Sequence, residues 1–140
     1  MASEFVTYLG FDGRCEEAFK RYEKVFGGKI VMMMRYADAP PGSIPQNPEA
    51  ANRIMHARLE AGGRMLMGGD SPMQGSSKPQ GFCVCVSTDN PSEAERIFGD
   101  LSEGGSVTMP IGETFWAQRF GMVTDTFGTP WMVNCEKTSV

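Results

Sequence analysis

The sequence AFKRYEKVFGG, residues 18–28, has a counterpart in AERIFGDLSEGG, residues 94–105, and this pair decides the fold. In both stretches apolar residues recur with the 3.6-residue period of an amphipathic helix, and a Gly-Gly pair follows. Glycine directly after such a periodic segment is a helix stop. We therefore predict two helices with the apolar stripes Ala18, Phe19, Tyr22, Val25, Phe26 and Ala94, Ile97, Phe98, Leu101.

The start of each helix also has a sequence signature. Glu16 and Glu17 fall in the first turn of the first helix, where carboxylates interact favourably with the helix dipole. Asn90, Pro91 and Glu93 fit the N-cap, N1 and N3 positions of the second helix.

Strand-like segments surround both helices in the same order. One precedes each helix and three follow it, at residues 5–11, 29–36, 54–59 and 65–67 for the first, and 81–88, 107–109, 116–123 and 130–135 for the second. Gly62-Gly63 predicts a hairpin turn, and Gly68-Gly69 is interpreted in the same way. A βαβββ unit therefore occurs twice.

Constant offsets support this internal duplication. Asp12 and Gly27-Gly28 match Asp89 and Gly104-Gly105 at 77 residues, and Met67 matches Met132 at 65 residues. The difference falls in residues 37–53, which hold four of the nine prolines. We predict an α+β single domain, residues 1–140, with modules at about 1–70 and 81–140 and a linker at 71–80.

Composition limits the classes of function. The chain has 140 residues, a mass of 15.3 kDa and a net charge of −4, without a basic run, which argues against binding to nucleic acid. No apolar stretch approaches the roughly 20 residues that span a bilayer, and residues 1–6 lack the features of a signal peptide. A cytoplasmic protein with no membrane partner is expected, in which Cys15, Cys83, Cys85 and Cys135 are reduced thiols.

Four segments carry a family resemblance, namely residues 8–11 (YLGF), 18–28, 55–59 (MHARL) and above all 125–134 (DTFGTPWMVN). They resemble the PhnB-like branch of the glyoxalase/bleomycin-resistance superfamily, also called vicinal oxygen chelate, a branch often labelled 3-demethylubiquinone-9 3-methyltransferase. The resemblance implies two modules that form a curved, barrel-like mixed sheet with a ligand cavity inside each cup. It also implies a homodimer.

The methyltransferase label finds no support in the sequence. Nucleotide-like methyl donors are usually held by a glycine-rich loop after a parallel strand. The chain has no G-x-G-x-x-G, and its repeat does not alternate strand and helix.

The superfamily's enzymes place His, Glu or Gln on the first and last strands of each module, where they hold a divalent ion. The matching positions here are Val6 or Thr7, Phe82 or Cys83, Met67, and Met132. None is a histidine or a carboxylate, and thioethers are weak donors for such ions. We therefore expect neither a catalytic metal nor another cofactor.

His56 is the only histidine and the candidate catalytic residue. It is either a hydrogen-bonded strand residue or an acid/base or ligand-orienting group. Asp125 is interpreted as a turn residue rather than a catalytic acid. The candidate ligand-binding residues, whose aromatic members core packing explains equally well, are Tyr8, His56, Met67, Trp116, Gln118, Phe120, Trp131 and Asn134.

Three functions follow from this. The first is binding of a small apolar or aromatic metabolite in the cupped sheet without a catalytic metal. The alternative is a divergent lyase, isomerase or oxygenase of the superfamily that uses His56 or an unorthodox metal site. The third is a dimeric scaffold without a small-molecule role. The eleven methionines fit either a soft pocket or the core, and the loops at 37–53 and 70–80 either flank a cavity mouth or merely connect strands.

Overall fold

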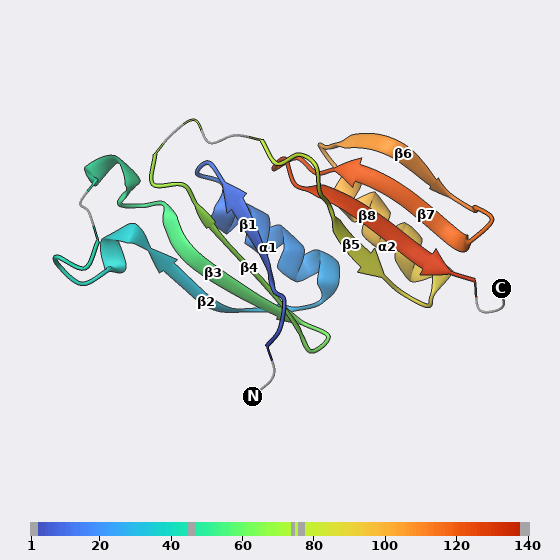
Figure 1. Cartoon of the computed structure of the whole chain (residues 1–140), viewed down its shortest axis with the longest axis horizontal. Helices are drawn as coiled ribbons and strands as arrows, with labels where there is room; N and C mark the ends of the chain where they lie inside the picture. The colour runs from blue at the N-terminus through green and yellow to red at the C-terminus, as the bar shows by residue number, and fades with distance from the viewer. Residues whose placement is uncertain (1–2, 45–46, 74, 76–77, 138–140) are drawn as a thin grey trace. The chain divides into compact units, whose positions relative to one another are not determined.

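The computed structural model describes residues 3–44, 47–73, 75 and 78–137, so parts of the loops at 37–53 and 70–80 lie outside it. Two α-helices, two short 3-10 helices (η1, Tyr36–Asp38, and η2, Pro48–Ala50) and eight strands occur in these ranges (Figure 1). The order is β1 (Thr7–Phe11), α1 (Cys15–Phe26), β2 (Lys29–Arg35), β3 (Ile54–Ala61), β4 (Arg64–Asp70), β5 (Val84–Ser87), α2 (Pro91–Ser102), β6 (Ser106–Gly112), β7 (Ala117–Thr124) and β8 (Pro130–Glu136). The repeated βαβββ unit and the α+β class are confirmed.

The eight strands form two mixed, four-stranded sheets with the same topology, β1-β4-β3-β2 and β5-β8-β7-β6. In each sheet the first strand pairs parallel with the last, and the other pairs are antiparallel. Neither sheet is closed, whereas the resemblance implies one barrel-like sheet. The chain divides into unit 1, Met1–Ser77, and unit 2, Lys78–Val140, at a point within the predicted linker. No helix in the described ranges is long and apolar enough to cross a membrane.

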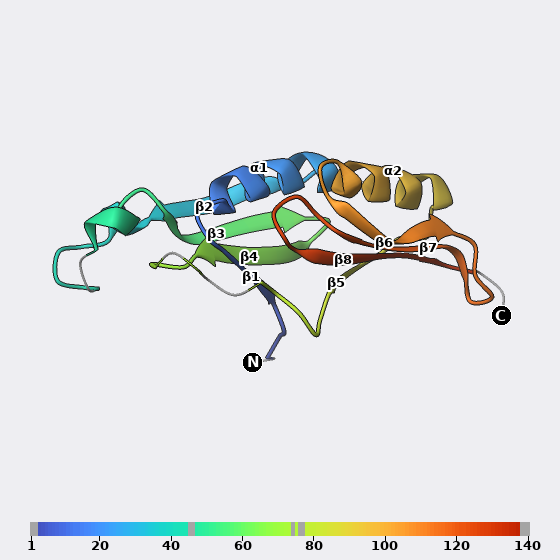
Figure 2. The same cartoon turned by 90° about the horizontal axis from the view of Figure 1, so that it is seen from above.

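Each unit has its core between the helix and one face of its sheet (Figure 2). In unit 1 the predicted stripe is buried except for the partly exposed Phe26, and it packs with Leu9, Phe11, Ala57 and Leu59. In unit 2 the whole predicted stripe is buried, and Asn90 caps α2 by accepting hydrogen bonds from the backbone N–H groups of Ser92 and Glu93.

The two Gly-Gly pairs have one structural explanation. Gly27 and Gly104 adopt φ angles of +64° and +71°, which favour glycine. Gly28 and Gly105 pass so close to β3 and β7 that an added Cβ would lie 2.4 Å from a backbone carbonyl oxygen, that of Glu60 or Thr124. The repeated motif therefore ends each helix and brings the chain back onto its own sheet.

A carboxylate at the end of β4 holds unit 1 together. Oδ1 of Asp70 accepts hydrogen bonds from the backbone N–H groups of Gly13 (2.8 Å) and Cys15 (3.0 Å), at the start of α1. Oδ2 accepts one from the N–H of Ile54 at the start of β3 (2.9 Å). Asp70 is only 5% exposed, so one side chain joins three segments that are distant in sequence.

The structure corrects the prediction for the second glycine pair. Gly62-Gly63 forms the predicted hairpin turn, with φ angles of +56° and +76°. The prediction for Gly68-Gly69 is wrong, because both lie inside β4. An added Cβ at Gly68 would lie 2.8 Å from both the Leu9 carbonyl oxygen and the Phe19 ring. At Gly69 it would lie 2.7 Å from the Met55 carbonyl oxygen and 2.8 Å from the Tyr8 hydroxyl, so these glycines make room for neighbouring backbone and for aromatic side chains.

Candidate ligand-binding faces

The surface of the first sheet that faces away from α1 carries a group of polar and thioether side chains. Gly68 lies against Phe19 of α1. Because successive side chains of a strand point to opposite faces, the adjacent residue Met67 points away from α1. The strand register then places one residue of each strand in a row on that side, in the order Tyr8, Met67, Arg58 and Met32. His56 and Met34 form the next pair. We call this surface open face 1; its residues are Tyr8, Met32, Met34, His56, Arg58 and Met67.

A chain of hydrogen bonds crosses open face 1. Nε of Arg58 donates to Nε2 of His56 at 3.0 Å, so this nitrogen is an acceptor and the imidazole proton belongs on Nδ1. Nδ1 lies 3.4 Å from the hydroxyl oxygen of Tyr8, and that hydroxyl donates to the backbone carbonyl of Met55, also at 3.4 Å. The rings of Tyr8 and His56 stack with centroids 5.7 Å apart. Arg58 thus fixes the orientation of the His56 ring, with Nε2 as the acceptor and Nδ1 towards Tyr8.

Tyr8 combines an exposed ring with a partly shielded hydroxyl. The residue is 53% exposed, but its hydroxyl lies over Gly69. Burial raises the pKa of the phenol, with smaller contributions from the charges of Cys15 and Tyr36. Tyr8 therefore keeps its proton near neutral pH and acts as a hydrogen-bond donor.

The second sheet has a corresponding surface on the side away from α2. An added Cβ on Gly121 would lie 2.7 Å from the Phe98 ring of α2, so Phe120 and Met122 point to the other side. Their register partners on β8 are Asn134 and Met132, and Met132 is also next to Cys85. We call this surface open face 2; its residues are Cys85, Phe120, Met122, Met132 and Asn134. The ring of Trp116, which precedes β7, lies 5.2 Å from that of Phe120.

Asn134 carries an unusual atom for a buried position. Its side-chain oxygen Oδ1 is buried but has no hydrogen-bond partner within residues 3–44, 47–73, 75 and 78–137. Buried polar atoms are almost always paired, so this oxygen is an exception among the described residues. Open face 2 therefore contains one buried, unpaired acceptor, which lies beside Phe120.

The predicted ligand-binding residues separate into three groups. Tyr8, His56 and Met67 meet on open face 1, and Trp116 joins Phe120 and Asn134 at open face 2. The Gln118 side chain donates to the backbone carbonyl of Glu136 at 3.0 Å, within an irregular part of β7. Trp131 is 2% exposed and is paired with Val123 on the α2 side of the sheet.

The indole of Trp131 has a structural role in the turn before β8. Its Nε1–H donates to Oδ2 of Asp125 at 2.8 Å. Oδ1 of Asp125 accepts hydrogen bonds from the backbone N–H groups of Phe127 and Thr129. The interpretation of Asp125 as a turn residue is confirmed, and the most distinctive segment of the sequence is explained by this turn.

Arg58, Met32 and Met34 were not among the predicted site residues. The alternation in the segment MHARL carried a signal for Arg58, because residues two apart on a strand share a face. The methionines carried none, because the ladder between β2 and β3 has an irregularity after Ile30, which changes the face that the later residues occupy.

The register of the strands also shows which residues occupy the positions that hold a metal in the superfamily's enzymes. Tyr8, not Val6 or Thr7, lies beside Met67, and Cys85, not Phe82 or Cys83, lies beside Met132. Burial raises the pKa of Cys85 as it does that of Tyr8, so both are protonated near neutral pH. A phenol, a thiol and two thioethers do not fit a hard divalent cation. No group of three His, Cys, Asp or Glu side chains suited to a metal occurs in the described part of the chain.

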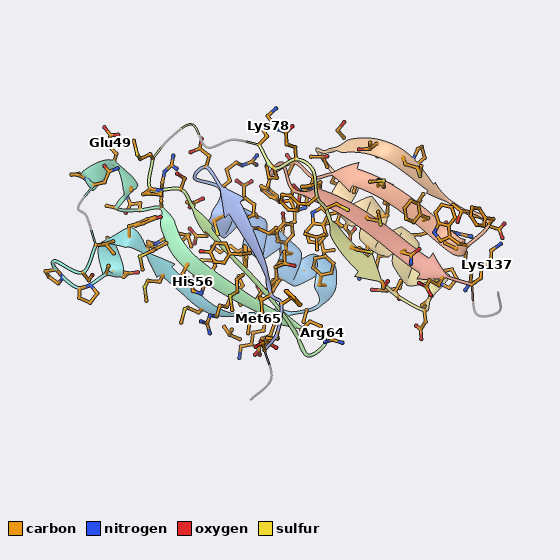
Figure 3. All side chains as sticks on the ribbon, viewed as in Figure 1. Glu49, His56, Arg64, Met65, Lys78 and Lys137 are labelled. Carbon is orange, nitrogen blue, oxygen red and sulfur yellow. The ribbon has the colours of Figure 1, made fainter. Side chains whose placement is uncertain are left out.

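A separate hollow of about 550 Å³ lies at the hairpin end of unit 1. Figure 3 shows Arg64 and Met65, two of its lining residues, at this hairpin, and His56 further along β3. The hollow is lined largely by the glycine turns and by the charged residues Glu4, Lys29, Glu60 and Arg64. It offers little apolar surface to a ligand, and the open faces remain the candidate sites.

Solved structures identify the class of protein to which this arrangement corresponds. A glyoxylase/bleomycin resistance protein/dioxygenase domain from Frankia sp. EAN1pec matches with a TM-score of 0.70 over 100% of this chain and 95% of that one, at 10% identity. At this identity the likeness shows the fold alone. The chain thus has the glyoxalase/bleomycin-resistance fold.

The chain belongs to the family described as 3-demethylubiquinone-9 3-methyltransferase, whose sequence model matches residues 3–134. Protein YjdN of Escherichia coli (strain K12) is 32% identical over 139 residues, 93% of each chain. Protein PA1353 from Pseudomonas aeruginosa is 43% identical, with a TM-score of 0.85 over 96% of this chain and 98% of that one. A putative 3-demethylubiquinone-9 3-methyltransferase, PhnB protein, from Bacillus cereus is 25% identical, with a TM-score of 0.79 over 95% and 99%. The PhnB-like resemblance is confirmed.

Proposed function

We propose that the chain binds a small apolar or aromatic metabolite on the open faces of its sheets, without a catalytic metal. The observation that carries this proposal is the buried, unpaired Oδ1 of Asn134 beside Phe120. An unsatisfied buried acceptor costs roughly 1–3 kcal/mol. A ligand with an N–H or O–H donor would remove this cost, while its ring packs against Phe120 and Trp116.

Isothermal titration calorimetry with two matched probes tests this function. 2-Naphthol has one O–H donor, and 2-methoxynaphthalene has the same ring system without it. Saturable binding of 2-naphthol, tighter than that of the ether, is expected for the wild type. The Asn134→Leu variant should bind both compounds equally.

Met132→Leu is the matched control, because it changes a neighbouring apolar side chain of open face 2 and leaves Asn134 in place. It should retain the preference for 2-naphthol. Failure of both probes to saturate would overturn the proposed function, whereas saturable binding would eliminate a scaffold without a small-molecule role.

A second candidate, enzymatic turnover, is favoured by the chain of contacts from Arg58 through His56 to Tyr8. Such a chain can move a proton to or from a ligand that contacts the phenol. Proton NMR of a bound compound would then show new resonances that accumulate with the wild type. They should be absent with a folded His56→Ala variant, and a bound compound that never changes would rule out its turnover.

We further propose that the protein is a homodimer. The exposed apolar side chains of Val107 and Met109 on β6 support this, because such surface is commonly covered by a partner. Light scattering should give twice the 15.3 kDa mass of one chain. A mass equal to one chain would contradict the proposal.

A further inference from the structure

We infer that open face 1 binds the carboxylate of an aromatic or apolar anion, and that Arg58 is the residue that receives it. This inference rests on the proposed function and names the class of ligand for one of its two faces.

Arg58 lies in an apolar part of the sheet. Its cross-strand neighbours on open face 1 are Met67 on β4 and Met32 on β2. Thioethers offer a guanidinium neither a charge nor a strong acceptor, and the surrounding side chains keep Arg58 partly buried. An anion that reaches this position therefore meets a cation with reduced screening by water.

The terminal nitrogens of Arg58 are available to such an anion. Its Nε is committed to Nε2 of His56, which fixes the side chain at one end. No carboxylate forms an ion pair with Arg58 in the part of the chain that the structure describes. Three other partly buried arginines form ion pairs, Arg35 with Glu16, Arg53 with Asp12 and Arg119 with Glu95.

The carboxylate that follows on the same face has a different neighbour. Glu60 is two residues beyond Arg58 on β3, and the register places it opposite Lys29. It lies at the hairpin end of the sheet, among the charged residues around the hollow there. Arg58 is thus the cation of the central row, and Glu60 belongs to the rim.

The geometry of the free nitrogens selects the class of ligand. A guanidinium with Nη1 and Nη2 free binds a planar carboxylate through two parallel hydrogen bonds. The stacked rings of Tyr8 and His56 and the thioethers of Met32, Met34 and Met67 supply apolar contact for the rest of the ligand. An aromatic carboxylate satisfies both parts of the face.

Calorimetry with 2-naphthoate and 2-naphthamide separates charge from shape, because the two probes share a ring system. Wild-type protein should bind the carboxylate at least tenfold more tightly than the amide, and the ratio should fall as the salt concentration rises. Arg58→Met should reduce the carboxylate affinity to that of the amide and leave the amide affinity unchanged. Arg58→Lys should give an intermediate ratio, because it keeps the charge without the planar fork.

Arg64→Met is the matched control, since it removes the same charge from an exposed hairpin position. It should retain the wild-type ratio. Equal wild-type affinity for the two probes would overturn this inference, and an unchanged ratio in a folded Arg58→Met variant would do the same. The wild-type comparison decides the question even if that variant fails to fold.

The two proposals fail separately. Binding of 2-naphthol that depends on Asn134, without a preference for 2-naphthoate over its amide, would leave the proposed function standing and reject the inference. Saturation by none of the four probes would reject both.

Discussion

At the scale of single residues, Asn134 and Asp70 show opposite solutions to burying a polar group. Asn134 leaves its Oδ1 without a partner in the described chain, whereas Asp70 fills both carboxylate oxygens with backbone N–H groups. The unpaired oxygen of Asn134 is expected to lower the stability of the free protein and to favour the binding of a ligand. The arrangement of Asp70 is expected to supply stability, because hydrogen bonds to a charged group are stronger than neutral ones.

Asn134→Leu should therefore make the free protein more stable and the complex weaker. Leucine has a similar size and removes the unsatisfied oxygen, so the free energy of unfolding should rise by about 1 kcal/mol. Urea denaturation of the free protein measures this change. A lower stability together with unchanged binding of 2-naphthol would contradict the role assigned to Asn134.

Asp70→Asn should lower the free energy of unfolding by at least about 2 kcal/mol. The amide keeps one acceptor oxygen and places an NH₂ group against backbone donors. Asp89→Asn is the control, because Asp89 is the equivalent of Asp12 before α2 and is exposed. Equal effects of the two substitutions in thermal unfolding would show that Asp70 does not join the segments as described.

At the scale of elements, the Gly-Gly pairs decide how each helix returns to its sheet. A Cβ at Gly28 or Gly105 would collide with backbone, which cannot move aside as a flexible side chain would. Gly99 offers the opposite case within α2, since no atom lies within 4 Å of an added Cβ.

Gly105→Ala should thus destabilise the protein by at least about 1 kcal/mol, as overpacking does. Gly99→Ala should stabilise it by up to about 1 kcal/mol, because alanine is the better helix former. The two variants differ only in where one methyl group is added, and chemical denaturation compares them directly. A loss of stability in Gly99→Ala would contradict the packing described for α2.

The same elements show what the sequence can predict. The apolar stripes of the helices, the Asn90 cap and the Gly-Gly pairs were predictable, because each depends on residues close together in the sequence. The ends of the strands were not predictable, because a strand extends only as far as a neighbouring strand pairs with it. Phe5 and Phe82 have the sequence character of strand residues, but they lie outside β1 and β5 and are exposed. The role of Asp70 and the unpaired Asn134 depend on contacts with distant segments, for which the sequence holds no periodic signal.

At the scale of the whole molecule, duplication has produced two scaffolds with different face chemistry. Arg58 pairs with Met67 in unit 1, and Met122 pairs with Met132 at the matching place in unit 2. A charged position in one copy is thus a thioether in the other. We expect the two faces to bind different ligands.

Ionisation also acts on the stability of the whole protein. Burial, followed by the negative charges of Asp70 and Glu16, raises the pKa of the Cys15 thiol above its usual value near 9. The folded state then holds this proton at a pH where the unfolded state releases it, so the stability is complete below pH 9 and falls as the pH rises further. The free energy of unfolding of Cys15→Ala should fall less steeply between about pH 9 and 11. Identical slopes in urea titrations would contradict this.

The pairing of first and last strands in each unit has a consequence for synthesis on the ribosome. β1 emerges early but finds its neighbour only when β4 has been made, and Asp70 is the last residue of β4. Until then β1 has an unpaired edge and α1 lacks the carboxylate at its start. We expect unit 1 to acquire its tertiary structure in one late step after residue 70 leaves the exit tunnel, and nascent chains that stop short of Asp70 to need protection from aggregation.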